Sequence, residues 1–203
     1  MKDLVVLVAD GCMKSSLHEI LSRHESLGAR PITFDVFGHP EHDPGVLLRG
    51  HLFVQPLRED YSHALLVFDR DGCGDPRAVT DLSTAVQANL NLSGWTGRSA
   101  VIILDPELEA WVWSDSPHVA KALGWSGAQK LRKWLMDNGH LREGDVKPTD
   151  PKRAMEKALE KVGLPQSTSI YRKIARTVSL ARCTDPAFLS LRATISGWFP
   201  SQA

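Results

Sequence analysis

Acidic side chains follow several apolar segments of this chain, at the points where strands are expected to end. Asp10 follows the first segment, and Asp69 and Asp71 follow the third. Glu109 lies shortly after the fourth. Carboxylate oxygens are the ligands that Mg²⁺ and Mn²⁺ prefer, and a cation relieves the repulsion between converging carboxylates. These residues predict a divalent-metal site that would polarise a phosphoryl group.

The strands that would position these acids are predicted over residues 4–9, 31–37, 63–68 and 99–104. Three of them lack polar alternation, as is typical of strands buried on both faces of a parallel sheet. Helices are expected over residues 15–27, 75–92 and 107–113, and residues 38–45, rich in Gly and Pro, are predicted to form a surface loop. Strands that alternate with helices predict an α/β fold with a mainly parallel sheet.

Beyond residue 116 the pattern becomes helical. Further helices are expected over residues 127–138, 150–162, 167–182 and 186–198. In parallel sheets, ligands bind beyond the carboxyl ends of the strands, which is where the acids would gather. For any single residue a simpler interpretation stays open, because Asp after a strand is also a common turn or helix-cap residue.

Several motifs resemble one known family. They are Asp10-Gly11, Asp69-Arg70-Asp71 and the pattern Pro-Glu-x-Glu-Ala-Trp-x-x-x-Asp over residues 106–115. In this order they resemble the TOPRIM-like fold, and in particular small bacterial TOPRIM-like proteins linked to phage defence. Those proteins are related to the nuclease domains of overcoming-lysogenization-defect proteins. The resemblance covers about residues 4–199 and includes Tyr171-Arg172-Lys173, Arg182 and Pro186-x-Phe188.

The resemblance implies a TOPRIM-like α/β domain over residues 1–115, with a helical C-terminal region over residues 116–203 packed on it. It implies that Asp69 and Asp71 bind Mg²⁺ (or Mn²⁺). Asp10 would be a general acid-base or a third ligand, and Glu109 a further ligand and catalytic acid. Two residues depart from the family pattern. Asp10 stands where the family usually has the longer Glu, and Lys14 stands where a second acid is common.

Charge is unevenly distributed along this chain, whose formal net charge is zero. Residues 1–146 hold 20 acidic and 14 basic side chains, whereas residues 147–182 hold three acidic and nine basic ones. Lys173 and Arg176 lie three residues apart and share one helix face, so they are candidate contacts to substrate phosphates. The alternative is that these bases form a solvated face, or a helix packed on the acidic body.

Composition excludes several classes of protein. The hydrophobic content of 42% over 203 residues is too high for a disordered chain. No apolar run approaches the roughly 20 residues of a membrane-spanning helix, and no signal peptide is expected before the first strand. Three cysteines and no such signal predict a reducing, cytoplasmic location. Cys12 and Cys73 are a weaker candidate redox pair or thiolate ligand, and residues 39–43 a weaker candidate metal loop.

Two functions from different classes therefore stand as hypotheses. The first is a Mg²⁺-dependent nuclease or phosphoryl-transfer component of a bacterial anti-phage defence system, favoured by Asp69, Asp71 and Glu109. The second is a catalytically degraded accessory subunit of such a system, favoured by Asp10 and Lys14. That subunit would bind nucleic acid or other subunits without cleaving anything. A nucleotide-binding sensor is a third, weaker alternative.

Overall fold

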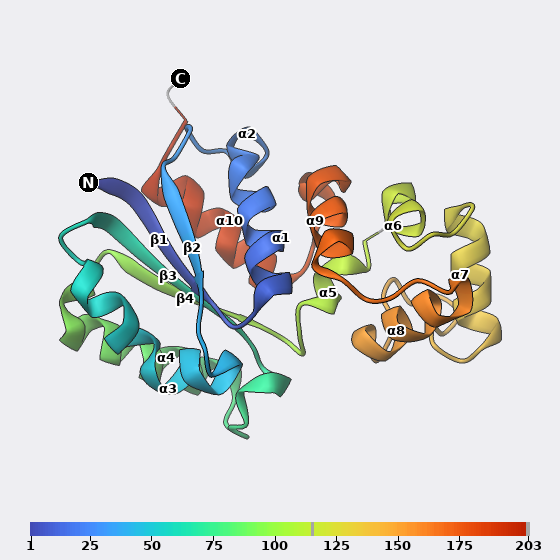
Figure 1. Cartoon of the computed structure of the whole chain (residues 1–203), viewed down its shortest axis with the longest axis horizontal. Coiled ribbons are helices and arrows are strands. Elements are labelled where there is room, and N and C mark those ends of the chain that lie inside the picture. Colours follow the sequence, from blue (N-terminus) through green and yellow to red (C-terminus); the bar gives the residue numbers. More distant parts are fainter. Residues whose placement is uncertain (115, 202–203) are drawn as a thin grey trace.

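The computed structural model describes residues 1–114 and 116–201, and in that part of the chain four parallel strands form a single sheet (Figure 1). The strands are β1 (Lys2–Val8), β2 (Phe34–Gly38), β3 (Tyr61–Asp69) and β4 (Ser99–Leu104). Their spatial order is β2-β1-β3-β4. The predicted α/β fold, with a parallel, Rossmann-like sheet and a helical C-terminal part, is confirmed.

Helices cover both faces of this sheet (Figure 1). One face packs against α1 (Gly11–Ser22) and α10 (Pro186–Trp198), and the other against α3 (His42–Val54) and α4 (Val79–Leu90). A further helix, α9 (Thr168–Thr177), packs on α1. The side chains of β1 alternate between two hydrophobic clusters, since Val6 belongs to the first and Val5 and Leu7 to the second. A strand buried on both faces needs an unbroken apolar segment, which explains the composition of β1.

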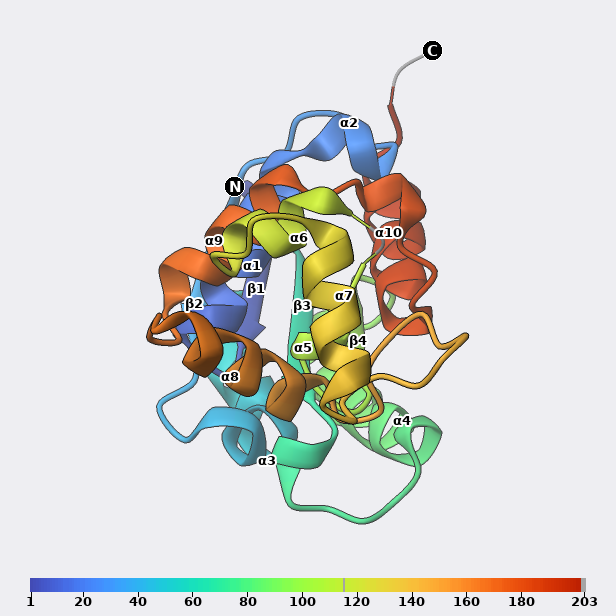
Figure 2. The same ribbon diagram turned by 90° about the vertical axis from the view of Figure 1, so that its right-hand side faces the viewer.

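A further group of helices lies beyond the carboxyl ends of the strands (Figure 2). These helices are α5 (Glu109–Val112), α6 (Pro117–Ala122), α7 (Ala128–Asp137) and α8 (Pro151–Val162). Short helical segments also occur at α2 (His24–Leu27), Gln55–Leu57, Asp71–Cys73, Asn91–Trp95 and Leu180–Arg182. One hydrophobic cluster runs from β1 through α8 to α10, so both predicted regions contribute to the same core. Asp115, which ends the first predicted domain and the 106–115 motif, lies outside the described residues.

The expected loop over residues 38–45 is wrong at its C-terminal half, because α3 begins at His42. Pro44 lies in the first turn of that helix, where its missing N–H costs nothing. Two glycines in α3 look unfavourable for a helix, but they allow close packing. A Cβ atom on Gly50 would lie 2.7 Å from Leu66 Cδ2 of β3, and one on Gly45 would lie 2.1 Å from His39 Nδ1. Tertiary contact therefore outweighs helix propensity here.

The helix expected over residues 167–182 is shorter in the structure. It ends at Thr177 and is followed by a 3₁₀ turn over Leu180–Arg182. The helix predicted over residues 186–198 has the bounds observed for α10, with Asp185 capping it. In the described part of the chain, no helix has both the length and the apolar composition needed to cross a membrane.

Candidate functional site

Asp69 lies at the centre of an acidic cluster at the carboxyl edge of the sheet. It is the last residue of β3, which is a central strand. Its Oδ1 atom is buried and has no hydrogen-bond partner in the described part of the chain. A buried carboxylate oxygen without a partner is unfavourable, and such atoms in native proteins often mark a site for an ion or ligand.

Asp43 supports Asp69 from the first turn of α3. Its Oδ1 accepts a hydrogen bond of 2.7 Å from the backbone N–H of Asp69. Its Oδ2 lies so near the turn after β3 that a Cβ atom on Gly72 would come within 2.5 Å of it. Glycine at position 72 therefore permits this close approach. Asp43 belongs to the weaker candidate metal loop over residues 39–43, but no sequence pattern linked it to Asp69.

The electrostatics show which acids lie near Asp69. Burial, followed by the charges of Asp43, Glu109, Asp10 and Glu107, raises the pKa of Asp69 to about 9. Burial also raises the pKa of Asp43, although the bond from the Asp69 N–H opposes this shift. Converging carboxylates each favour the protonated form of the others. Asp69 and Glu109, predicted from separate strand ends, are thus brought together with Asp10.

Asp10 lies at the exposed rim of this cluster, at the start of α1. Its side chain caps α1 by accepting a hydrogen bond of 2.8 Å from the backbone N–H of Met13. Cys12 lies in the first turn of α1, where burial, with the charges of Asp10 and Glu109, raises the pKa of the thiol to about 11. A thiol with this pKa stays protonated at neutral pH, which disfavours Cys12 as a thiolate ligand.

Glu109 is the buried member of the cluster, with 6% of its surface exposed. Its Oε1 accepts hydrogen bonds from the Tyr171 hydroxyl of α9 and, at 3.3 Å, from Gln166 Nε2. Gln166 Nε2 also donates to the Tyr171 oxygen. Burial, with the neighbouring charge of Glu109, raises the pKa of Tyr171 far above its usual value, so Tyr171 remains a hydrogen-bond donor. The C-terminal part of the chain thereby orients a carboxylate from the sheet region.

Glu107 and Lys152 form the side of the cluster next to α8. The backbone N–H of Lys152 donates to Glu107 Oε1 at 3.1 Å, and Lys152 Nζ lies 3.8 Å from Glu107 Oε2. Burial lowers the pKa of Lys152, but the charges of Glu107, Glu109 and other acids outweigh this effect and raise it. Lys152 is therefore a cation close to the acids, which sequence reasoning did not single out.

Asp71 lies at the entrance to the cluster rather than inside it. It is exposed on the 3₁₀ turn after β3, and its charge is not among the main causes of the shift in the pKa of Asp69. Together with Glu107 and Lys152 it lines an open pocket of about 600 Å³ beside α8. The side chain that joins Asp69 is thus Asp43 rather than the predicted Asp71.

The two predicted phosphate contacts, Lys173 and Arg176, are exposed on α9. Neither forms an ion pair within residues 1–114 and 116–201, and neither is among the main causes of the pKa shifts of Asp69 and Glu107. The face of α9 that reaches the site instead carries Tyr171. Lys152 is the base that contacts the acids, since its Nζ lies 3.8 Å from Glu107 Oε2.

The weaker candidate sites do not assemble. Cys73 belongs to the hydrophobic cluster on the α3 and α4 face, and Cys12 packs against the cluster on the opposite face. The two cysteines therefore cannot form a pair. In the loop before α3, His39 Nδ1 accepts a bond from the Glu41 N–H, whereas Asp43 turns towards Asp69.

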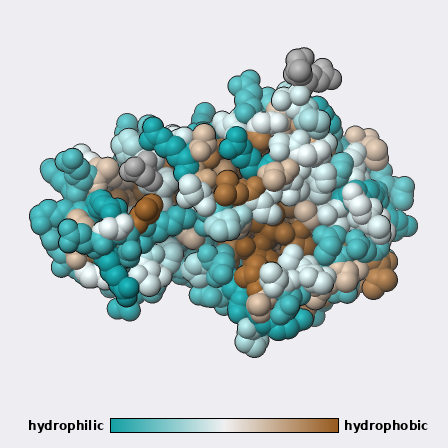
Figure 3. Space-filling view, turned by 180° about the vertical axis from the view of Figure 1, so that it is seen from behind, coloured by the Kyte–Doolittle hydropathy of each residue, from teal (hydrophilic) through white to brown (hydrophobic). Residues whose placement is uncertain are grey.

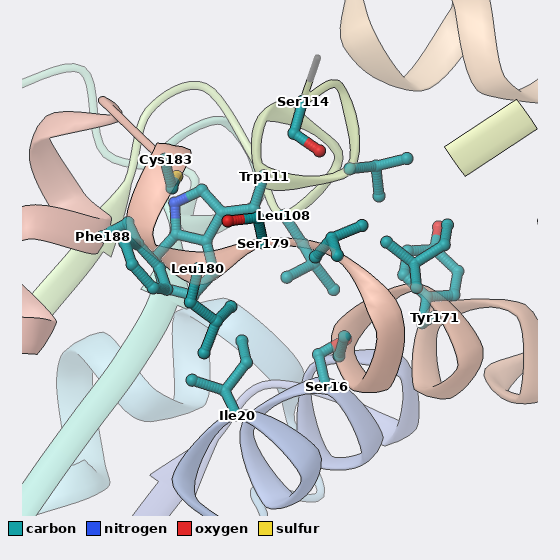
Figure 4. A pocket seen from close by; sticks show the side chains of 14 residues that line it. Ser16, Ile20, Leu108, Trp111, Ser114, Tyr171, Ser179, Leu180, Cys183 and Phe188 are labelled. Atoms are coloured by element: carbon teal, nitrogen blue, oxygen red, sulfur yellow. The ribbon is translucent and has the colours of Figure 1, made fainter. Parts of the chain in front are cut away.

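An apolar pocket is lined in part by Tyr171 (Figure 4), whose hydroxyl contacts Glu109 of the acidic cluster. Its walls come from α1, α5, α9 and α10 and include Ile20, Trp111 and Phe188. The cavity encloses only about 40 Å³. Its size and apolar lining do not suit a phosphorylated ligand, so we assign it to packing between helices.

The donor chemistry at Asp69 fits a hard divalent cation. The cluster offers carboxylate oxygens from Asp10, Asp43 and Asp69, and one of these oxygens is buried without a partner. Oxygen ligands of this kind suit Mg²⁺ or Mn²⁺. As they stand, no three His, Cys, Asp or Glu side chains in residues 1–114 and 116–201 form a group ready to hold a metal. Binding would therefore require the carboxylates to move together.

Comparisons with protein-family models, with curated proteins and with solved structures found no match to this chain.

Proposed function

We propose that this protein is a TOPRIM-like, Mg²⁺-dependent nuclease or phosphoryl-transfer enzyme that acts in a bacterial anti-phage defence system. The observation that carries the chemical part is the gathering of Asp10, Asp43 and Glu109 around Asp69 at the carboxyl edge of a parallel sheet. The family and the link to phage defence rest on the sequence resemblance alone.

Asp69 and Asp43 would hold the cation, Asp10 would be a general acid-base or a third ligand, and Glu109 would be a further acid behind them. When bound, the ion would supply positive charge that polarises a phosphoryl oxygen and offsets the repulsion between the carboxylates. Tyr171 and Gln166 keep the Glu109 carboxylate oriented.

Hydrolysis of a phosphodiester requires two proton movements. Water loses a proton as its oxygen bonds to phosphorus, and the leaving oxygen gains one as the old P–O bond breaks. Asp10 is the acid of the cluster that lies exposed at its rim, so it is suited to accept the proton from water. Lys152, beside Glu107 at the open pocket, is suited to bind the phosphate that enters.

The test is to incubate the purified protein with plasmid, single-stranded DNA, RNA and tRNA in the presence of Mg²⁺ or Mn²⁺. Asp69→Asn and Asp43→Asn are compared with Asp60→Asn, an exposed acid close to the amino end of β3. Melting temperature is measured with and without the metal. Cleavage by the wild type and Asp60→Asn, lost in the other two variants, supports the enzyme. No cleavage of any substrate and no metal-dependent change in melting temperature would refute it.

An accessory subunit is the second candidate function, and one observation favours it. The Asp10 carboxylate already serves as the cap of α1, and it is shorter than the Glu usual in the family that the chain resembles. For this function, metal would raise the melting temperature and nucleic acid or another subunit would bind, yet no substrate would be cleaved.

A further inference from the structure

The outer side of the edge strand β4 is unpaired. The carbonyl of Arg98 accepts a hydrogen bond from the Ala64 N–H of β3. Backbone groups of successive strand residues point to opposite sides, so Ser99, Val101 and Ile103 direct theirs away from the sheet. Within residues 1–114 and 116–201, the backbone N–H and C=O groups of these three residues have no hydrogen-bond partner.

This open edge lies at the bottom of a groove of about 540 Å³ between α4 and α10. In the view from behind, a hydrophobic area is exposed in the middle of this face (Figure 3). The side chains on the two walls of the groove are mostly small and uncharged, and the acids Asp105 and Asp185 lie at its end. The walls include Thr80, Ser83 and Thr84 on α4 and Pro186, Ala187 and Ser190 on α10. Because the side chains on both walls are small, the backbone of another strand can approach β4 closely.

We propose that β4 pairs with β4 of a second copy of this chain, in an antiparallel two-fold arrangement centred on Val101. In this register Val101 faces Val101 of the copy, and Ser99 faces Ile103. All three outward-facing residues then form hydrogen-bonded pairs, and each unpaired N–H meets an unpaired C=O. The axis is perpendicular to the sheet, so α4 meets α4 and α10 meets α10, as in an isologous dimer.

The charge pattern favours a second copy. β4 carries no charged side chain from Ser99 to Leu104, so two copies meet without repulsion. The opposite edge strand, β2, carries Asp35 in an ion pair with Lys2, which is a common device against strand pairing. Antiparallel pairing also brings the exposed Asp105 of each copy next to the Arg98 end of the other.

The test is the mass of the full chain in solution, measured by light scattering and sedimentation from about 1 to 100 µM. Val101→Pro removes the central outward N–H, which the monomer does not use. Thr80→Arg combined with Ser190→Arg places charge on both walls and leaves the strand intact. Ser22→Arg, on the exposed side of α1, is the matched control.

We expect a mass near twice 22.4 kDa for the wild type and for Ser22→Arg. The Val101→Pro and double Arg variants should raise the dimer dissociation constant at least about tenfold. Amide exchange at Ser99, Val101 and Ile103 should slow as protein concentration rises. A monomer at every concentration, or a dimer that withstands both groove variants, would overturn the proposal. A monomer at every concentration would instead indicate an extended peptide of another protein as the occupant of the groove.

Discussion

The backbone N–H of Asp69 donates a hydrogen bond of 2.7 Å to Asp43 Oδ1, which joins the end of β3 to the first turn of α3. The two residues are 26 positions apart, and this bond links the acidic cluster to the helix that covers one face of the sheet. Replacement of Asp43 therefore tests the cluster directly.

We expect Asp43→Asn to retain the fold, because an amide oxygen can still accept the bond from Asp69. The loss of one negative charge should weaken the metal site and lower the cleavage rate by about 10- to 100-fold. The measurement is the initial rate of cleavage with the metal concentration varied. Asp60→Asn should match the wild type, and an unchanged rate for Asp43→Asn would remove Asp43 from the site.

Asp69→Asn should stabilise the protein in buffer that contains EDTA. Burial and neighbouring charges raise the pKa of Asp69 to about 9. Between pH 4 and pH 9 the native state therefore binds a proton that the unfolded state has lost, and native stability falls as pH rises. Asn cannot ionise, so the variant should lose this dependence and gain on the order of 1 to 3 kcal/mol at neutral pH.

Urea unfolding of both proteins at pH 5, 7 and 9 measures this effect. The difference in unfolding free energy between Asp69→Asn and the wild type should increase with pH. Added Mg²⁺ should reverse the ranking at neutral pH, because only the wild type retains the carboxylate. A difference that is constant across the pH range would show that Asp69 is ionised in the native state.

Tyr171→Phe should disturb the orientation of Glu109. The variant removes the hydroxyl that donates to the buried Glu109 carboxylate. A hydrogen bond to a charged group contributes about 1.5 to 3 kcal/mol, so a stability loss of that size is expected, with a fall in cleavage rate. Tyr61→Phe is the matched control, since Tyr61 donates to Asp35 at the other end of the sheet. Equal cleavage rates in the two variants would argue against a role for Tyr171 at the site.

Lys152→Ala should weaken nucleic-acid binding more than Arg176→Ala does. Lys152 lies at the acidic cluster, whereas Arg176 is exposed on α9. Removal of one phosphate contact lowers the slope of log affinity against log salt by about one. Fluorescence anisotropy with a labelled oligonucleotide in EDTA, at several salt concentrations, measures that slope. A larger effect of Arg176→Ala would restore α9 as the phosphate-binding surface.

Local patterns were sufficient for much of the secondary structure. The apolar segments predicted β1, β3 and β4, because a strand buried on both faces needs continuous apolar residues. Pro186 predicted the start of α10, because proline is favoured in the first turn of a helix whatever the helix packs against. The sequence also indicated Asp10, Asp69 and Glu109 as candidates, since Asp69 ends a strand and the other two follow one.

Tertiary structure decided the composition of the cluster. The strand order places β1 beside β3, which brings Asp10 and Asp69 to one edge, and no local pattern specifies which strands are neighbours. Asp43 joins them only because α3 packs closely on β3 through Gly50. The orientation of Glu109 depends on Tyr171, which lies 62 residues away. Sequence thus determined which residues end the strands, while the packing of distant elements determined which of them meet.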